Sequence, residues 1–150
     1  MDFSIPDELQ ATLDAARAFM RAHVLPVEQE LLLGRGHGDV DAAMAPVRAQ
    51  AKEQGLWLPQ LSKAHGGMGL SVLEHGLMSE VLGESPLGHY ALNCQAPDAG
   101  NMELMLEYAS ASQKSRWLEP ILSGEIRSCF AMTEPEFAGS NPTRMGTRAV

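Results

Sequence analysis

The sequence predicts a mainly α-helical chain, a helical bundle that ends in a single β-strand. Apolar residues recur at helical spacing along most of the first 124 residues, and residues that start and stop helices bracket several of these stretches. The spacing of apolar residues changes to two only after Gly124. We therefore expect residues 1–125 to form a helical domain and residues 126–150 to begin a β domain that is incomplete here.

The first predicted helix begins near Pro6 and Asp7 and is amphipathic. Proline suits a first helical turn because its missing N–H would be unpaired there in any case. The apolar face of this helix is formed by Leu9, Leu13, Ala16, Met20 and Val24. We expect Pro26 to end the helix, because proline inside a helix removes a hydrogen bond and clashes with the preceding turn.

The second predicted helix follows a glycine-rich loop at residues 34–38. It should run from about Val40 until Gly55 ends it, since glycine commonly terminates helices. Its inward-facing residues are Met44, Val47 and Ala51.

Three more helices are predicted further along the chain. Ser71 and Glu74 have the spacing of a capping box, which starts a helix at residues 72–82. Residues 97–108 and 113–122 form the fourth and fifth predicted helices. We expect the last to be interrupted or to start near Pro120 and to be ended by Gly124. No internal repeat accompanies these helices.

A strand is predicted from Ile126 to Thr133, where Phe130 and Met132 alternate with small or hydroxyl-bearing residues. Pro135 then prevents further ladder hydrogen bonds and opens a turn. A lone strand leaves its N–H and C=O groups unpaired, so we expect sheet partners outside these 150 residues.

Composition excludes some classes of function. The net charge is −8, and the 11 Lys and Arg residues are scattered, which argues against a nucleic-acid surface. No signal peptide or stretch of membrane-spanning length is visible, so we expect a cytoplasmic protein. Cys94 and Cys129 are expected to be buried, reduced thiols of the core, and the five histidines lack the spacing of metal ligands.

Several segments share the order and spacing of one known family. They are Gly55-Leu56-Trp57, Leu58-Pro59, His65-Gly66-Gly67-Met68-Gly69-Leu70-Ser71, Glu80-Val81-Leu82-Gly83-Glu84-Ser85-Pro86 and the stretch from Gln113 to Ile126. Together with Phe130-Ala131-Met132-Thr133-Glu134-Pro135, they resemble the flavin-dependent acyl-CoA dehydrogenases. The resemblance covers the family's N-terminal helical domain and the start of its middle β domain.

The resemblance implies an FAD site at the end of the predicted strand. It maps the Met132 backbone and the Thr133 hydroxyl to the edge of the flavin ring, and it implies that Phe130 and Gly139 also bind the cofactor. Gly139 lies in the following turn, and Ser140 maps to contacts with the flavin pyrophosphate and with the CoA substrate. A strand end suits this role because it holds backbone donors rigidly.

The resemblance also implies an activity for the complete enzyme, the FAD-dependent oxidation of the α,β bond of acyl-CoA thioesters. In the family a carboxylate from the C-terminal domain removes the α-proton, so we expect no catalytic residue in this chain and no activity from it alone. An acceptor like electron-transfer flavoprotein and a homo-oligomer are the expected partners.

Two other interpretations remain open. Residues 65–69 are rich in glycine and could approach a phosphate, although the absence of a preceding strand favours a structural turn that leads into Ser71. The chain could also be a non-catalytic helical module that binds an acyl thioester or a protein partner, with its exposed strand pairing with another chain.

Overall fold

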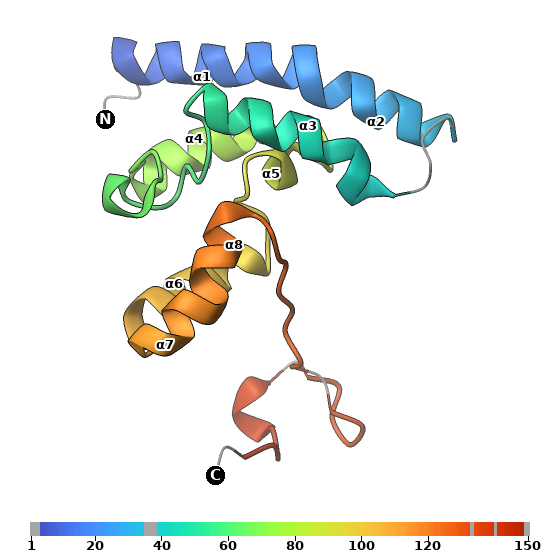
Figure 1. The fold of residues 1–150 in the computed structure, drawn as a ribbon, viewed down its shortest axis with the longest axis vertical. Coiled ribbons are helices and arrows are strands. Elements are labelled where there is room, and N and C mark those ends of the chain that lie inside the picture. The colour runs from blue at the N-terminus through green and yellow to red at the C-terminus, as the bar shows by residue number, and fades with distance from the viewer. Residues whose placement is uncertain (1–3, 35–38, 133, 140, 149–150) are drawn as a thin grey trace.

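The computed structural model describes residues 4–34, 39–132, 134–139 and 141–148. Regular structure within these ranges is helical, which confirms the predicted fold class. Figure 1 shows a long helical rod at the top, shorter helices beneath it, a second group of helices below these, and a C-terminal segment that leads away from the helices.

The rod consists of α1 (Asp7–Phe19), the π-helical segment η1 (Met20–Val24) and α2 (Leu25–Leu32). The prediction that Pro26 ends the first helix is wrong, because Pro26 lies inside α2. The amide of Leu25 bonds the carbonyl of Met20, five residues back, and this wider turn gives the proline ring room against the preceding turn.

The same arrangement recurs near the end of the helical region. There α7 (Ala111–Gln113), the π-helical segment η3 (Lys114–Leu118) and α8 (Glu119–Ser123) are continuous. The amide of Glu119 bonds the carbonyl of Lys114 just before Pro120. Gly124 ends α8 in the left-handed conformation, with φ at 77°, which confirms the predicted stop.

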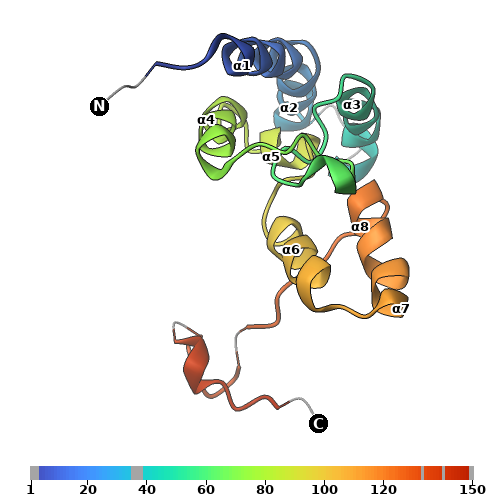
Figure 2. The same ribbon diagram turned by 90° about the vertical axis from the view of Figure 1, so that its left-hand side faces the viewer.

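The remaining helices agree with most of the predicted boundaries. The segments α3 (Val40–Glu53), α4 (Val72–Leu82) and α6 (Asp98–Tyr108) were all expected, and the capping box at the start of α4 is present. The short helices η2 (Lys63–His65), α5 (Gly88–Ala91) and η4 (Pro142–Arg144) were not predicted. Figure 2 shows α5 between the upper helices and the α6–α8 group.

The hydrophobic core joins these helices into one body, residues 7–124. In this core α1 packs against α4, α2 against α3, and α6 against η3 and α8. The fully buried large side chains include Leu13, Phe19, Met20, Met44, Leu58, Met78, Leu82, Leu92 and Met102. The helical body therefore has the continuous core of an independently packed unit.

The glycine-rich turn at residues 65–69 has a structural role. The amide of Gly67 donates to the Ser62 carbonyl at 3.1 Å, and that of Gly69 donates to the Leu61 carbonyl at 2.7 Å. A Cβ atom on Gly67 would lie 2.2 Å from the Leu61 carbonyl oxygen, so only glycine fits there. The amides of this loop thus donate to nearby backbone carbonyls, which supports a structural turn over a phosphate site.

The C-terminal segment, which we call the tail, comprises residues 126–148. It does not contain the strand predicted from Ile126 to Thr133, because residues 126–132 have no ladder partner in the described part of the chain, and Thr133 lies outside that part. The pairing recorded in the tail is an isolated bridge between Glu134 and Phe137. A strand needs a neighbour for its backbone groups, and apolar alternation alone does not supply one. The prediction that both cysteines are buried is wrong for Cys129, which is exposed because it lies on this tail, whereas Cys94 is buried in the helical body.

Candidate functional site

The residues predicted to bind a cofactor lie on the tail. Phe130 and Met132 are 59% and 48% exposed, so neither side chain is enclosed by the helical body. Gly139 has a positive φ of 79°, as a tight turn requires. Thr133 and Ser140 lie outside the described residues.

Glu134 organises the turn that follows. Its carboxylate accepts hydrogen bonds from the amides of Gly146 and Thr147, both at 2.7 Å, and from the Thr147 hydroxyl at 2.5 Å. These donors, led by the Thr147 hydroxyl, lower the pKa of Glu134 below its ordinary value. The carboxylate therefore links the turn after residue 132 to the last described residues.

An apolar groove of about 280 Å³ lies beside the start of the tail. It is lined by Asn101, Leu104, Met105, Trp117, Ile121, Ile126, Arg127 and Ser128. A second depression along α6 and η3 shares Leu104, Met105 and Trp117 with it, so the apolar surface continues along these helices. Leu104 is 57% exposed and Trp117 is 42% exposed, and an apolar ligand or surface would bury both.

The tail begins at a polar attachment to α6. Asp98 is fully buried in the first turn of this helix, and its carboxylate accepts hydrogen bonds from Arg127 and Ser128. Asn101, one turn further along α6, donates to the Ser128 hydroxyl at 2.8 Å. The groove and the tail are thus both built on α6.

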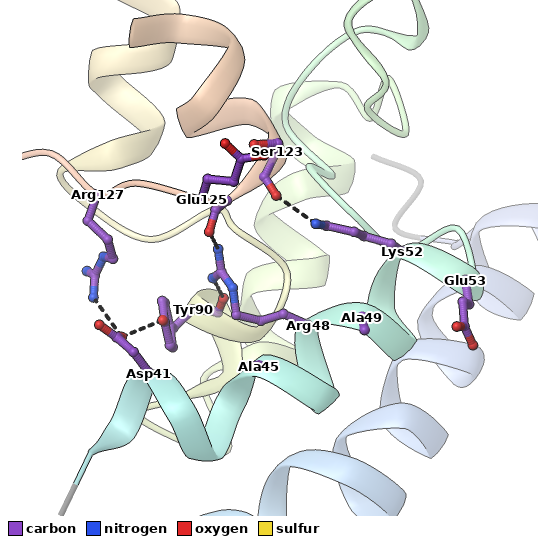
Figure 3. A pocket seen from close by; sticks show the side chains of 11 residues that line it. Asp41, Ala45, Arg48, Ala49, Lys52, Glu53, Tyr90, Ser123, Glu125 and Arg127 are labelled. Atoms are coloured by element: carbon purple, nitrogen blue, oxygen red, sulfur yellow. Dashed lines mark hydrogen bonds and ion pairs between the residues drawn. The ribbon is translucent and has the colours of Figure 1, made fainter.

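A larger cleft of about 520 Å³ lies between α3, α5 and the end of α8 (Figure 3). Its charged residues pair mainly with the protein itself. The Tyr90 hydroxyl donates to Asp41 at 2.5 Å, Arg127 lies 3.9 Å from the same carboxylate, and Lys52 donates to the Ser123 carbonyl at 2.6 Å. We interpret this cleft as a polar seam between the two groups of helices.

Arg48 is the buried centre of that seam. It donates to the Tyr90 carbonyl at 2.5 Å and to the Asn93 side chain at 3.3 Å, and its guanidinium lies over the rings of Trp57 and Tyr90. Burial is the main cause that lowers the pKa of Arg48 below its ordinary value, and Tyr90 opposes this effect. Asn93 in turn donates to the Ile121 carbonyl at 2.9 Å, so this network connects α3 to α8.

Sequence reasoning missed both buried charges, although each left a signal. Arg48 follows Met44 by four positions and Val47 by one, so it falls on the predicted inner face of its helix. Asp98 directly follows Pro97 at a predicted helix start, where carboxylates commonly accept backbone or side-chain donors. A charge within an apolar face is the pattern that could have identified Arg48.

Within the residues that the structure describes, no helix is both long and apolar enough to span a membrane. The same residues contain no group of three or more His, Cys, Asp or Glu side chains arranged to hold a metal ion.

The described residues thus form a helical body with an apolar groove, and a polar attachment holds the tail to this body. The family model for the acyl-CoA dehydrogenase N-terminal domain matches residues 6–125. The chain therefore belongs to the acyl-CoA dehydrogenase family and contains its N-terminal domain.

Individual relatives agree with this assignment. The chain is 39% identical over 146 residues to human acyl-CoA dehydrogenase family member 11, covering 91% of this chain and 18% of the relative. It is 35% identical over 153 residues to the probable acyl-CoA dehydrogenase FadE2 of Mycobacterium tuberculosis, covering 98% of this chain and 37% of the relative. The chain thus spans only a minor part of the length of these relatives.

A solved structure shares the fold. The chain superimposes with a TM-score of 0.82 on a solved chain from Mycobacterium abscessus that carries an acyl-CoA dehydrogenase assignment. The two are 37% identical, and the match covers 95% of this chain and 38% of the solved one.

Proposed function

We propose that this chain is the N-terminal portion of an FAD-dependent acyl-CoA dehydrogenase that oxidises the α,β bond of acyl-CoA thioesters. The chain contributes one wall of the combined acyl and flavin site. The catalytic base and the electron acceptor, of the electron-transfer flavoprotein type, come from outside these 150 residues. The complete protein works as a homo-oligomer.

One observation carries this proposal. The apolar groove on α6 and η3 lies directly beside the start of the tail, and Ile126, Arg127 and Ser128 belong to both. A hydrocarbon chain suits an apolar groove, because burying each CH₂ group gains about 0.8 kcal/mol. The reacting end of such a chain would then lie near the segment that the resemblance assigns to flavin.

The residues of the tail fit a flavin ring edge. Cys129 to Met132 have no recorded hydrogen-bond partner among the described residues, so their backbone donors are free for a ligand. The exposed apolar side chains of Phe130 and Met132 suit a planar aromatic group. We propose that Phe130, Met132, Thr133, Gly139 and Ser140 hold FAD, with Ser140 also contacting CoA. FAD, when bound, would supply the acceptor for the hydride that leaves the β-carbon.

The first experiment is spectroscopic and uses the complete gene product that contains this chain. The purified protein is expected to show flavin absorbance that bleaches when acyl-CoA is added without an electron acceptor. The isolated 150-residue chain is expected to show no bleaching. Absence of flavin from the complete protein would contradict the proposal and would favour a non-catalytic module.

A variant of Thr133 tests the assignment of the flavin edge. Thr133→Val keeps the shape of the side chain and removes one hydrogen bond, which typically costs about 1 kcal/mol of binding. We expect weaker FAD retention with unchanged melting of the apoprotein. Ser62→Ala, in an exposed loop of the body, is the matched control and should change neither. Equal FAD affinity in the unmutated protein and both variants would show that the Thr133 hydroxyl does not bind FAD.

A variant of the groove tests the placement of the acyl chain. Leu104→Gln puts a polar amide into the groove and should raise KM several-fold for long acyl-CoA substrates and little for short ones. Leu73→Gln makes the same exchange at an exposed position on α4 and should leave both values unchanged. An equal change in KM for long and short substrates would show that the acyl chain does not bind in this groove.

A further inference from the structure

We propose that Asp98 is a positioning residue for the flavin-edge segment, because it fixes the register of residues 127–132 against α6. This inference rests on the proposed function, since it assigns a role within the same site. Asp98 belongs to the helical domain and is distant in sequence from the tail, and it determines the position of the tail on α6.

The carboxylate of Asp98 has four hydrogen-bond donors. One oxygen accepts from the Ser128 amide at 2.7 Å and from the Ser128 hydroxyl at 2.5 Å. The other accepts from the Arg127 guanidinium at 3.2 Å and from the side-chain amide of Gln95. Asp98 is 1% exposed, so these donors replace the water that a buried carboxylate has lost.

Three of these four donors belong to the tail. Only Gln95 belongs to the helical body, so the interactions of Asp98 serve mainly to hold the segment that follows α8. A residue needed only for core packing at this position would be apolar, because a buried carboxylate is costly unless donors surround it.

Further contacts on both anchor residues make the attachment directional. Asn101 donates to the Ser128 hydroxyl from the same face of α6. The Arg127 guanidinium lies 4.7 Å from the centre of the Tyr90 ring and 3.9 Å from Asp41. Arg127 and Ser128 are therefore held by side chains from α3, α5 and α6 at the same time.

The attachment sets the register of the tail because two consecutive residues bond to different oxygens of one carboxylate. A slip by one residue would move Phe130 and Met132 into the places of their neighbours. Arg127 must meet one oxygen of Asp98 while Ser128 meets the other, and only one register satisfies both. In this register Phe130 lies beside Gly100 of α6: a Cβ atom added to this glycine would be 3.8 Å from the Phe130 ring.

The test uses the complete gene product with Asp98→Asn and Ser128→Ala. In Asp98→Asn an NH₂ group faces one of the tail donors, which disrupts the register at constant side-chain volume. Ser128→Ala keeps the carboxylate and removes one hydroxyl. Glu107→Gln on the exposed side of the same helix is the control for the loss of charge. FAD dissociation constants, flavin absorption spectra, kcat and KM, and the exchange rate of the Ser128 amide are measured at a temperature where every variant has native helical circular dichroism.

We expect Asp98→Asn to weaken FAD binding about tenfold or more and Ser128→Ala by about threefold to tenfold, as loss of charged and neutral hydrogen bonds predicts. Both should shift the flavin spectrum, and Asp98→Asn should speed exchange of the Ser128 amide, whereas Glu107→Gln should change none of these. A purely structural role would lower the melting temperature and leave FAD affinity and spectrum of the folded protein intact, which would overturn the inference alone. An unmutated protein without flavin would overturn the proposed function and this inference with it.

Discussion

The helical body and the tail differ in the burial of their phenylalanine side chains and in whether they have a core. In the body, large apolar residues such as Phe19 are buried among their own helices, with 2% of that side chain exposed. In the tail, Phe130, Met132 and Phe137 are between 41% and 59% exposed. The body therefore has a buried core of its own, whereas the tail is held to it through the attachment at Asp98.

The largest test of this comparison uses two phenylalanines. Phe19→Ala should lower the free energy of unfolding of the chain by about 3–5 kcal/mol, because it removes a buried ring and leaves a cavity. Phe130→Ala should change it by less than about 0.5 kcal/mol, as expected for an exposed side chain. Urea denaturation followed by circular dichroism measures both. Comparable losses for the two variants would mean that the tail packs on the body.

The second test removes the polar centre of the body. Arg48→Met keeps the length of the side chain and leaves the Tyr90 carbonyl and the Asn93 side chain without their donor, so we expect a loss of about 2–3 kcal/mol. Arg17→Met removes an arginine from an exposed ion pair with Asp14 and should cost less than about 0.5 kcal/mol. Equal losses would show that the Arg48 network does not join α3 to α8.

Local signals in the sequence were sufficient for most helix boundaries of the body. The capping box at Ser71 and the left-handed Gly124 act through neighbouring backbone groups, so their effect can be predicted without knowing the fold. The prediction for Pro26 is wrong because the π-helical turn at Met20–Val24, which accommodates the proline, is a property of the backbone path. Pro120 follows a second π-helical turn in the same way, so a proline two residues after the turn is the feature that the two sites share.

Features that depend on distant partners could not be predicted in this way. Alternating residues after Ile126 have the pattern of a strand, but a strand forms only where another strand supplies hydrogen bonds. The roles of Arg48 and Asp98 depend on residues 42 and 30 positions away, at Tyr90 and Ser128. The predicted cofactor residues come from the resemblance, and their roles stay predictions.

The third test compares the two cysteines, one in each region. Burial raises the pKa of the Cys94 thiol to about 12 from its ordinary value of 9.0. Above pH 9 the unfolded chain loses this proton while the folded chain keeps it, so the unfolded state binds fewer protons and stability falls as the pH rises from 9 to 12. The contribution is at most about 1.4 kcal/mol per pH unit.

The free energy of unfolding between pH 8 and 11 should therefore fall less steeply in Cys94→Ala than in the unmutated chain. Cys129→Ala, in the exposed tail, should retain the original slope. A thiol reagent at pH 8 should modify Cys129 rapidly and Cys94 only after denaturation. Identical slopes in all three proteins would show that Cys94 is accessible to water in the folded state.

The smallest test compares two helix caps with similar chemistry. The Ser71 hydroxyl accepts from the Glu74 amide at 3.3 Å at the start of α4, and the Asn141 side chain accepts from the Thr143 amide at 3.1 Å at the start of η4. Ser71→Ala should cost about 1 kcal/mol, because α4 packs on α1 and its fraying is coupled to global unfolding. Asn141→Ala removes a similar bond from a three-residue helix in the tail, outside the cooperative core, and should leave the unfolding midpoint unchanged. A hydrogen bond contributes to global stability only when the segment it holds unfolds together with the core, so a loss in Asn141→Ala equal to that in Ser71→Ala would place the tail in the same cooperative unit as the body.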